Sequence, residues 1–146
     1  MNEPALELTL VPLEAHDPDL PGVAALHREP SVARYLHLSE AYFSYVTETP
    51  EVVYYKIMAG QRLLGGIQAE LEGDTLSLLV CVGEAYRRRG VAFSALRALL
   101  EGLPEGILRV EAAVEAENLP SLRLFEKLGF RRCGWAEGTL TYRLTR

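Results

Sequence analysis

The chain has 146 residues, a formal net charge of −5 and a hydrophobic content of 49 %, enough for one well-filled core, so we expect a single domain over residues 1–146. A general nucleic-acid binder is normally basic, so the acidic balance argues against nucleic-acid partners. No apolar run approaches the ~20 residues of a membrane span. The N-terminal sequence MNEPALEL also lacks the basic and apolar regions of a signal peptide. We therefore expect a cytoplasmic protein with no membrane partner.

The two cysteines are Cys81 and Cys133. Their spacing matches neither a metal-ligand pattern nor a disulfide framework. We expect free thiols and no bound metal ion.

The first fifty residues predict one strand and two helices. Alternation over residues 5–13 predicts the strand. Residues 15–26 predict a helix with Asp17 as its N-cap and Pro18 in the first helical position. A second helix is expected over residues 31–46. Its apolar, aromatic and histidine positions are Val32, Tyr35, Leu36, His37, Tyr42, Tyr45 and Val46. The tyrosine cluster either packs amphipathically or lines an acceptor pocket, and the pattern leaves both open.

Three consecutive strands follow, over Val52–Met58, Leu63–Leu71 and Thr75–Val82. The short connections at residues 59–61 and 72–74 predict antiparallel hairpins. A glycine pair inside the second strand, at positions 65 and 66, predicts a β-bulge or a close approach of another backbone.

The third of these strands leads into a basic loop, Arg87–Ala92, which opens a helix. The apolar side of that helix has a 3.6-residue period and consists of Val91, Ala95, Leu96, Leu99, Leu100 and Leu103. Free backbone N–H groups and the positive end of the helix dipole make such a loop suited to an anion. Gly90 has no Cβ to keep a phosphate away from the backbone. From these residues alone, a phosphate site and a solvated basic turn both remain open.

The C-terminal part predicts a strand, a helix and a hairpin. In the strand Ile107–Val114, alternate residues face opposite ways, and Glu111, Ala113 and Glu115 share one side. Asn118 is a good N-cap and Gly129 a good terminator for the next helix. The hairpin joins Arg131–Ala136 to Thr139–Thr145, and its exposed edges are consistent with a homodimer. The resulting order is β-α-α-β-β-β-α-β-α-β-β, with the helix after the basic loop as a right-handed crossover between parallel strands.

Two motifs resemble the GCN5-related N-acetyltransferase (GNAT) family. Arg87-x-x-Gly90-x-Ala92 matches the family's acyl-CoA loop, Gln/Arg-x-x-Gly-x-Gly/Ala. The second family motif is Asn-x-x-Ala/Ser-x-x-Leu-Tyr-Glu-Lys-Leu-Gly-Phe, and it is matched at Asn118, Ser121, Leu124, Glu126, Lys127, Leu128, Gly129 and Phe130. The motifs stand in the family's order and at its spacing. The resemblance implies a GNAT-like α/β (α+β) fold, with a mixed, mostly antiparallel sheet flanked by helices.

The resemblance also implies a co-substrate, acetyl-CoA, with its pyrophosphate on the basic loop and its pantetheine beside the preceding strand. The residues implied in this contact are Val80, Cys81, Val82, Arg87, Arg88, Arg89, Gly90, Val91, Ala92, Asn118, Ser121 and Phe125. The implied reaction is direct attack of a primary amine, from a small molecule or a peptide, on the thioester.

Two departures from the family pattern concern proton transfer. Phe125 replaces a tyrosine that protonates the departing thiolate, and Ala113 replaces a glutamate that serves as base in one branch. A positioned acid or base is worth about 10²–10⁴ in rate. We therefore expect a low-pKa amine, or another carboxylate acting through water. The candidates for this carboxylate are Glu70, Glu111 and Glu115. The alternative for each of them is a solvated surface charge. The two departures also support an alternative to the enzyme, a non-catalytic acyl-CoA-binding module.

Overall fold

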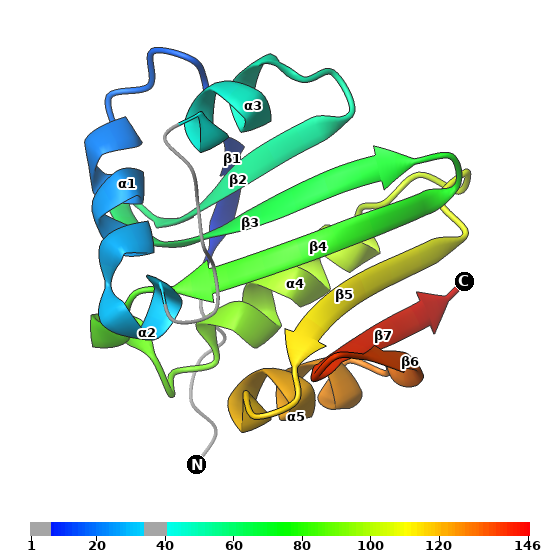
Figure 1. Cartoon of the computed structure of the whole chain (residues 1–146). Coiled ribbons are helices and arrows are strands. Elements are labelled where there is room, and N and C mark those ends of the chain that lie inside the picture. Colours follow the sequence, from blue (N-terminus) through cyan, green and yellow to red (C-terminus); the bar gives the residue numbers. More distant parts are fainter. Residues whose placement is uncertain (1–6, 34–40) are drawn as a thin grey trace.

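The computed structural model describes residues 7–33 and 41–146, and their strands form a single seven-stranded sheet (Figure 1). The strand order is β1-β2-β3-β4-β5-β7-β6. The strands are β1 Thr9–Pro12, β2 Val52–Ala59, β3 Arg62–Glu72, β4 Thr75–Val82, β5 Arg109–Glu115, β6 Arg131–Ala136 and β7 Thr139–Thr145. Neighbouring strands are antiparallel except β4 and β5, which are parallel. The expected mixed, mostly antiparallel sheet is confirmed.

Helices cover both faces of this sheet (Figure 1). They are α1 Leu20–Arg28, α2 Pro30–Ala33, α3 Tyr42–Glu48, the 3₁₀ turn η1 Glu84–Tyr86, α4 Val91–Glu101 and α5 Leu119–Lys127. The main core lies between the sheet and the α4/α5 layer, and it includes Ile67, Leu96, Val110 and Phe125. Because strand residues alternate in direction, the other face of β2–β4 packs against α1, α2 and α3.

The prediction of one long helix over residues 31–46 is wrong. The structure has two short helices there, α2 and α3, and Ala41 is the N-cap of α3. Tyr35, Leu36 and His37 lie outside the described residues. Tertiary contacts set the position of α3, because Tyr42 and Tyr45 donate hydrogen bonds from it to Gln68 and Glu70 of β3. These contacts join residues far apart in the chain, so helical periodicity does not report them.

The first helix also starts later than expected. Asp17 and Pro18 precede α1, and Asp19 occupies the N-cap position. The reason is that the Asp17 carboxylate accepts hydrogen bonds from the backbone N–H groups of Glu14 and Asp19, which stabilises a turn instead of a helix start. In the described part of the chain the first strand, β1, is shorter than the predicted range.

The expected close approach of another backbone is confirmed at Gly65 of β3, whereas Gly66 makes room for a side chain. A Cβ on Gly65 would overlap the carbonyl oxygen of Cys81, and a Cβ on Gly66 would overlap the hydroxyl of Tyr54. The pairing of β2 with β3 also shifts register between Ile57 and Met58, opposite this segment. The two glycines therefore let β2, β3 and β4 pack closely beside the candidate active site.

Candidate active site

The parallel strands β4 and β5 diverge partway along their length. Their pairing runs from Thr75 and Arg109 to Leu78 and Ala112 and then stops, although both strands continue. Beyond that point, residues 79–82 have no strand partner on this edge among the described strands. A cleft of about 1010 Å³ lies here. The exposed backbone of β4 is thus open to an extended ligand that can form hydrogen bonds with it.

The basic loop closes one end of this cleft. Gly90 has a φ of 75°, and Arg88 just before it has a φ of 63°. Gly90 is also the N-cap of α4 and has no side chain to satisfy the first N–H groups of the helix. The Arg87 Nε–H donates to the carbonyl oxygen of Val82 at 3.2 Å and ties the loop to β4. The loop therefore presents free backbone donors and arginines to an anion, and a pyrophosphate fits this donor set.

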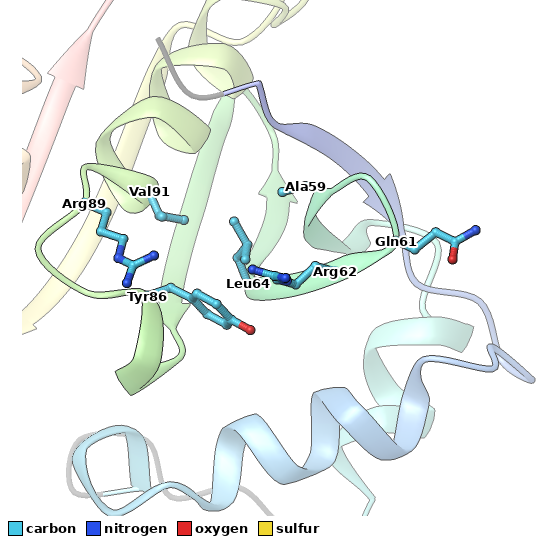
Figure 2. Close-up of a pocket in the computed structure, with 7 residues that line it drawn as sticks. All are labelled: Ala59, Gln61, Arg62, Leu64, Tyr86, Arg89 and Val91. Carbon is cyan, nitrogen blue, oxygen red and sulfur yellow. The ribbon is translucent and has the colours of Figure 1, made fainter. Parts of the chain in front are cut away.

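Most residues implied in acetyl-CoA contact are brought together by this cleft. Those lining it are Val80, Cys81, Val82, Arg87, Arg88, Gly90, Val91, Ala92, Asn118, Ser121 and Phe125. The exception is Arg89, whose side chain lines a second, neighbouring cleft (Figure 2).

The α5 side of the cleft is fixed by local contacts. The Asn118 side chain accepts a hydrogen bond from the backbone N–H of Ser121 at 3.4 Å, so the expected N-cap is confirmed. Lys127 Nζ lies 4.5 Å from the centre of the Phe93 ring and links α5 to α4. Phe125 is 3 % exposed and packs edge-on against Phe130. Position 125 thus contributes apolar packing where the family pattern has a hydroxyl.

Three carboxylates line the same cleft, on Glu70, Glu111 and Glu115. Glu70 accepts a hydrogen bond from the Tyr45 hydroxyl at 2.6 Å. Glu111 pairs with Arg143, whose Nη2 lies 2.6 Å from a carboxylate oxygen. Glu115 makes no such side-chain contact within the described chain. Of the three, Glu115 is the one whose carboxylate has neither a hydrogen-bond nor an ion-pair partner among the described side chains.

A buried polar cluster behind the cleft has no signal in the sequence. His27 of α1 places Nε2 2.6 Å from the Tyr54 hydroxyl and 3.6 Å from the Cys81 sulfur. The other ring nitrogen, Nδ1, is buried with no hydrogen-bond partner in the described chain. Burial lowers the pKa of His27 to about 4 and raises the pKa of the Cys81 thiol to about 11. Near neutral pH both groups are therefore uncharged.

Within residues 7–33 and 41–146, no group of three or more His, Cys, Asp or Glu side chains is placed to hold a metal ion. None of the helices in these ranges is long and apolar enough to cross a membrane.

The sequence matches a known domain family and a curated relative. The model of the acetyltransferase (GNAT) domain family matches residues 7–131. The catalytic subunit NAA20 of the N-terminal acetyltransferase B complex of Arabidopsis thaliana is 31 % identical over 107 residues. That alignment covers 64 % of this chain and 61 % of the relative.

Solved structures share the fold over nearly the whole chain. An acetyltransferase from Thermus thermophilus superposes with a TM-score of 0.82 at 24 % identity, covering 97 % of this chain and 98 % of that one. Arabidopsis thaliana NAA60 in complex with acetyl-CoA superposes with a TM-score of 0.77 at 18 % identity, covering 96 % and 100 %. The family match and the two motifs agree, and the chain belongs to the GNAT acetyltransferase family.

Proposed function

We propose that this protein is an acetyl-CoA-dependent N-acetyltransferase that acetylates a primary amine of a small molecule or peptide. The observation that carries the proposal is the divergence of β4 from β5 directly beside the Gly90 loop. Pantetheine would lie along residues 80–82, with the pyrophosphate on the loop and a backbone N–H near Val80 facing the developing oxyanion. NAA60, which has this fold, has been solved with acetyl-CoA.

The chemistry favours direct attack of the amine on the thioester. The alternative nucleophile in the cleft is Cys81. Since burial raises the pKa of its thiol to about 11, Cys81 stays protonated near neutral pH. The departing CoA thiolate, with a pKa near ~8.5, is a tolerable leaving group without a dedicated acid. Phe125 is therefore compatible with turnover.

The amine must lose a proton, and Glu115 is the side chain placed best to accept it through water. It lies on β5 two residues from Ala113, which holds the family's base position, and on the same face. Glu111 flanks Ala113 on the other side, but its carboxylate is engaged by Arg143. Together with Glu70, these residues give the cleft a negative lining that suits a cationic amine.

A second candidate function is a non-catalytic acyl-CoA-binding module. It is favoured by the apolar packing of Phe125 and by the exposed Ala113, which leave both usual proton-transfer positions without a titratable group. This candidate shares the cofactor cleft and differs only in lacking turnover.

The deciding experiment is thiol release from acetyl-CoA across polyamines, amino acids, aminoglycosides and short peptides at pH 7 and pH 9. Amine-dependent release establishes the enzyme and its acceptor class. Near pH 7.4 a lysine amine is about one part in a thousand neutral and an α-amino group roughly a quarter neutral. A steep rise toward pH 9 therefore marks catalysis without an efficient base. Acetyl-CoA binding without release from any amine would support the binding module instead.

A further inference from the structure

A second cleft, of about 670 Å³, lies next to the cofactor cleft. Tyr86 and Val91 line both, so these two residues form the wall between them. The remaining lining comes from the β2–β3 hairpin and the basic loop: Ala59, Gln61, Arg62, Leu64 and Arg89 (Figure 2). The volume falls within the 300–1,000 Å³ that is usual for small-molecule sites.

Two arginines point into this cleft from different parts of the chain. Arg62 begins β3 just after the hairpin turn, and Arg89 precedes Gly90 in the basic loop. Figure 2 shows their side chains directed toward one another across the cleft, above the Tyr86 ring. They converge because the hairpin and the basic loop line the same cleft, and neither arginine belongs to a local motif that predicts the other.

Neither arginine has an ion-pair partner within the described chain. Three other arginines pair with carboxylates: Arg97 with Glu101, Arg109 with Asp74 and Arg143 with Glu111. In a chain with a net charge of −5, two cations facing the same cleft without a counter-ion create a local positive potential. Such a potential attracts an anion.

The rest of the lining is apolar. Ala59, Leu64 and Val91 form walls, and the Tyr86 ring adds an aromatic surface. Guanidinium groups bind carboxylates and phosphates through paired, charge-assisted hydrogen bonds. The combination therefore suits a molecule with one anionic group and one apolar group.

We propose that this cleft is a second ligand site, separate from the acetyl-CoA site, which binds a small organic anion with an apolar body. Arg62 and Arg89 hold the carboxylate or phosphate of this ligand, and the apolar walls hold its body. The bound anion then lies against Tyr86 and Val91, at the back of the cofactor loop. The proposal does not depend on which amine the protein acetylates, or on whether it acetylates one.

The test is calorimetric titration of the wild-type chain with phenyl phosphate, benzoate and inorganic phosphate at low ionic strength. Arg62→Gln is the variant, because Arg62 lies outside the cofactor cleft. Arg131→Gln is the matched control, because it removes the same charge from the exposed strand β6, which lines neither cleft. We expect saturable binding of phenyl phosphate, weaker binding of inorganic phosphate, and a loss of at least roughly tenfold in Arg62→Gln. Arg131→Gln should stay within about twofold of wild type, and benzoate shows whether a carboxylate replaces the phosphate.

Three results would overturn the proposal. The first is no saturable binding of phenyl phosphate or benzoate by protein that unfolds cooperatively. The second is equal affinity of Arg62→Gln and Arg131→Gln for these probes. The third is an Arg62→Gln variant that binds acetyl-CoA more weakly but 3′-dephospho-acetyl-CoA normally, which would assign the cleft to the 3′-phosphate of the cofactor. The anion titrations need no cofactor, so a failure of acetyl-CoA binding would count against the proposed function alone.

Discussion

Gly90 and Gly73 have the same unusual backbone conformation in different surroundings. Their φ angles are 75° and 64°, and a Cβ on either would meet no atom within 4 Å. An aspartate at either position is therefore strained by the backbone and not by a steric clash. The difference is location, because Gly90 opens α4 at the cofactor cleft and Gly73 lies in the β3–β4 turn.

Gly90→Asp is expected to weaken acetyl-CoA binding at least roughly 100-fold, because it places a carboxylate where the loop donors face an anion. Gly73→Asp should lose similar stability and keep its affinity. Isothermal calorimetry with acetyl-CoA measures the affinities, and urea unfolding measures the stabilities. Normal affinity in Gly90→Asp would show that the cofactor site is assigned wrongly.

Arg88→Ala is a milder change in the same loop. The backbone donors of the loop remain in this variant, so we expect acetyl-CoA affinity to fall by about tenfold or less. A loss as large as that of Gly90→Asp, in the same calorimetric assay, would mean that side chains and not backbone groups hold the pyrophosphate.

Glu115→Gln tests the assignment of the base. If Glu115 accepts the amine proton through water, kcat should fall by about 10²-fold while the KM for acetyl-CoA stays unchanged. Glu105→Gln is the control, because Glu105 is exposed in the α4–β5 connection and lies outside both clefts. Steady-state rates of thiol release measure both variants. Full turnover by Glu115→Gln at pH 7 would remove Glu115 from the mechanism.

Among the elements, the connection between β1 and α1 is tied to β2 by one buried lysine. Lys56 Nζ lies 3.0 Å from Asp17 Oδ1 and 2.8 Å from Asp19 Oδ2. Burial lowers the pKa of Lys56, but the hydrogen bonds to Asp19 and Asp17 outweigh it, so its pKa is raised overall. The lysine is thus charged and paired, and removing it would leave Asp17 buried without a counter-ion.

Lys56→Met should lower the free energy of unfolding by about 3–5 kcal/mol, the usual cost of breaking a buried ion pair from one side. Arg97→Met breaks the exposed pair with Glu101 and should cost less than about 1 kcal/mol. Urea denaturation at pH 7 measures both. Equal losses in the two variants would mean that the Lys56 cluster is no more than a surface pair.

The distance along the chain between contacting residues explains which elements the sequence predicts well. The hairpins of β2, β3 and β4 and the α5 cap depend on residues within a few positions of one another, and their predictions are confirmed. At the start of α1, the Asp17 carboxylate accepts hydrogen bonds from the backbone N–H groups of Glu14 and Asp19 and is also paired with Lys56, thirty-nine positions away. The N-cap pattern does not report this distant partner. The features of the site also divide into local ones and ones that depend on distant contacts. The loop and the Asn118 cap are local, whereas the His27 cluster and the facing arginines exist only after the sheet has formed.

Across the whole molecule, His27 joins the outer helices to the sheet. Its ring contacts Tyr42 and Phe43 of α3, Tyr54 of β2, and Cys81 of β4. Tyr54 and Cys81 lie on the face of β2–β4 that packs against α1, α2 and α3. A charge on this ring would have no counter-ion among its contacts, so protonation of His27 opposes the packing of the entire layer.

The stability of the fold should therefore fall in mild acid. Burial lowers the pKa of His27 to about 4 in the folded state, from 6.5 for a histidine exposed to water. The folded state thus favours the neutral ring. The contribution of the neutral His27 ring to folding stability is fully present above pH 6.5 and is lost as the pH falls through 6.5 toward 4. The shift corresponds to about 3 kcal/mol in the free energy of unfolding.

His27→Gln isolates this effect, because glutamine keeps a hydrogen-bonding nitrogen but does not titrate. We expect urea unfolding at pH 7, 5.5 and 4.5 to show wild type losing stability relative to His27→Gln across this range. Carboxylates that titrate in both proteins cancel in the difference. His16→Gln, which removes an exposed histidine, should follow wild type at every pH. A constant difference between wild type and His27→Gln would mean that water or local opening reaches the ring, and that the layer over β2–β4 is not closed in solution.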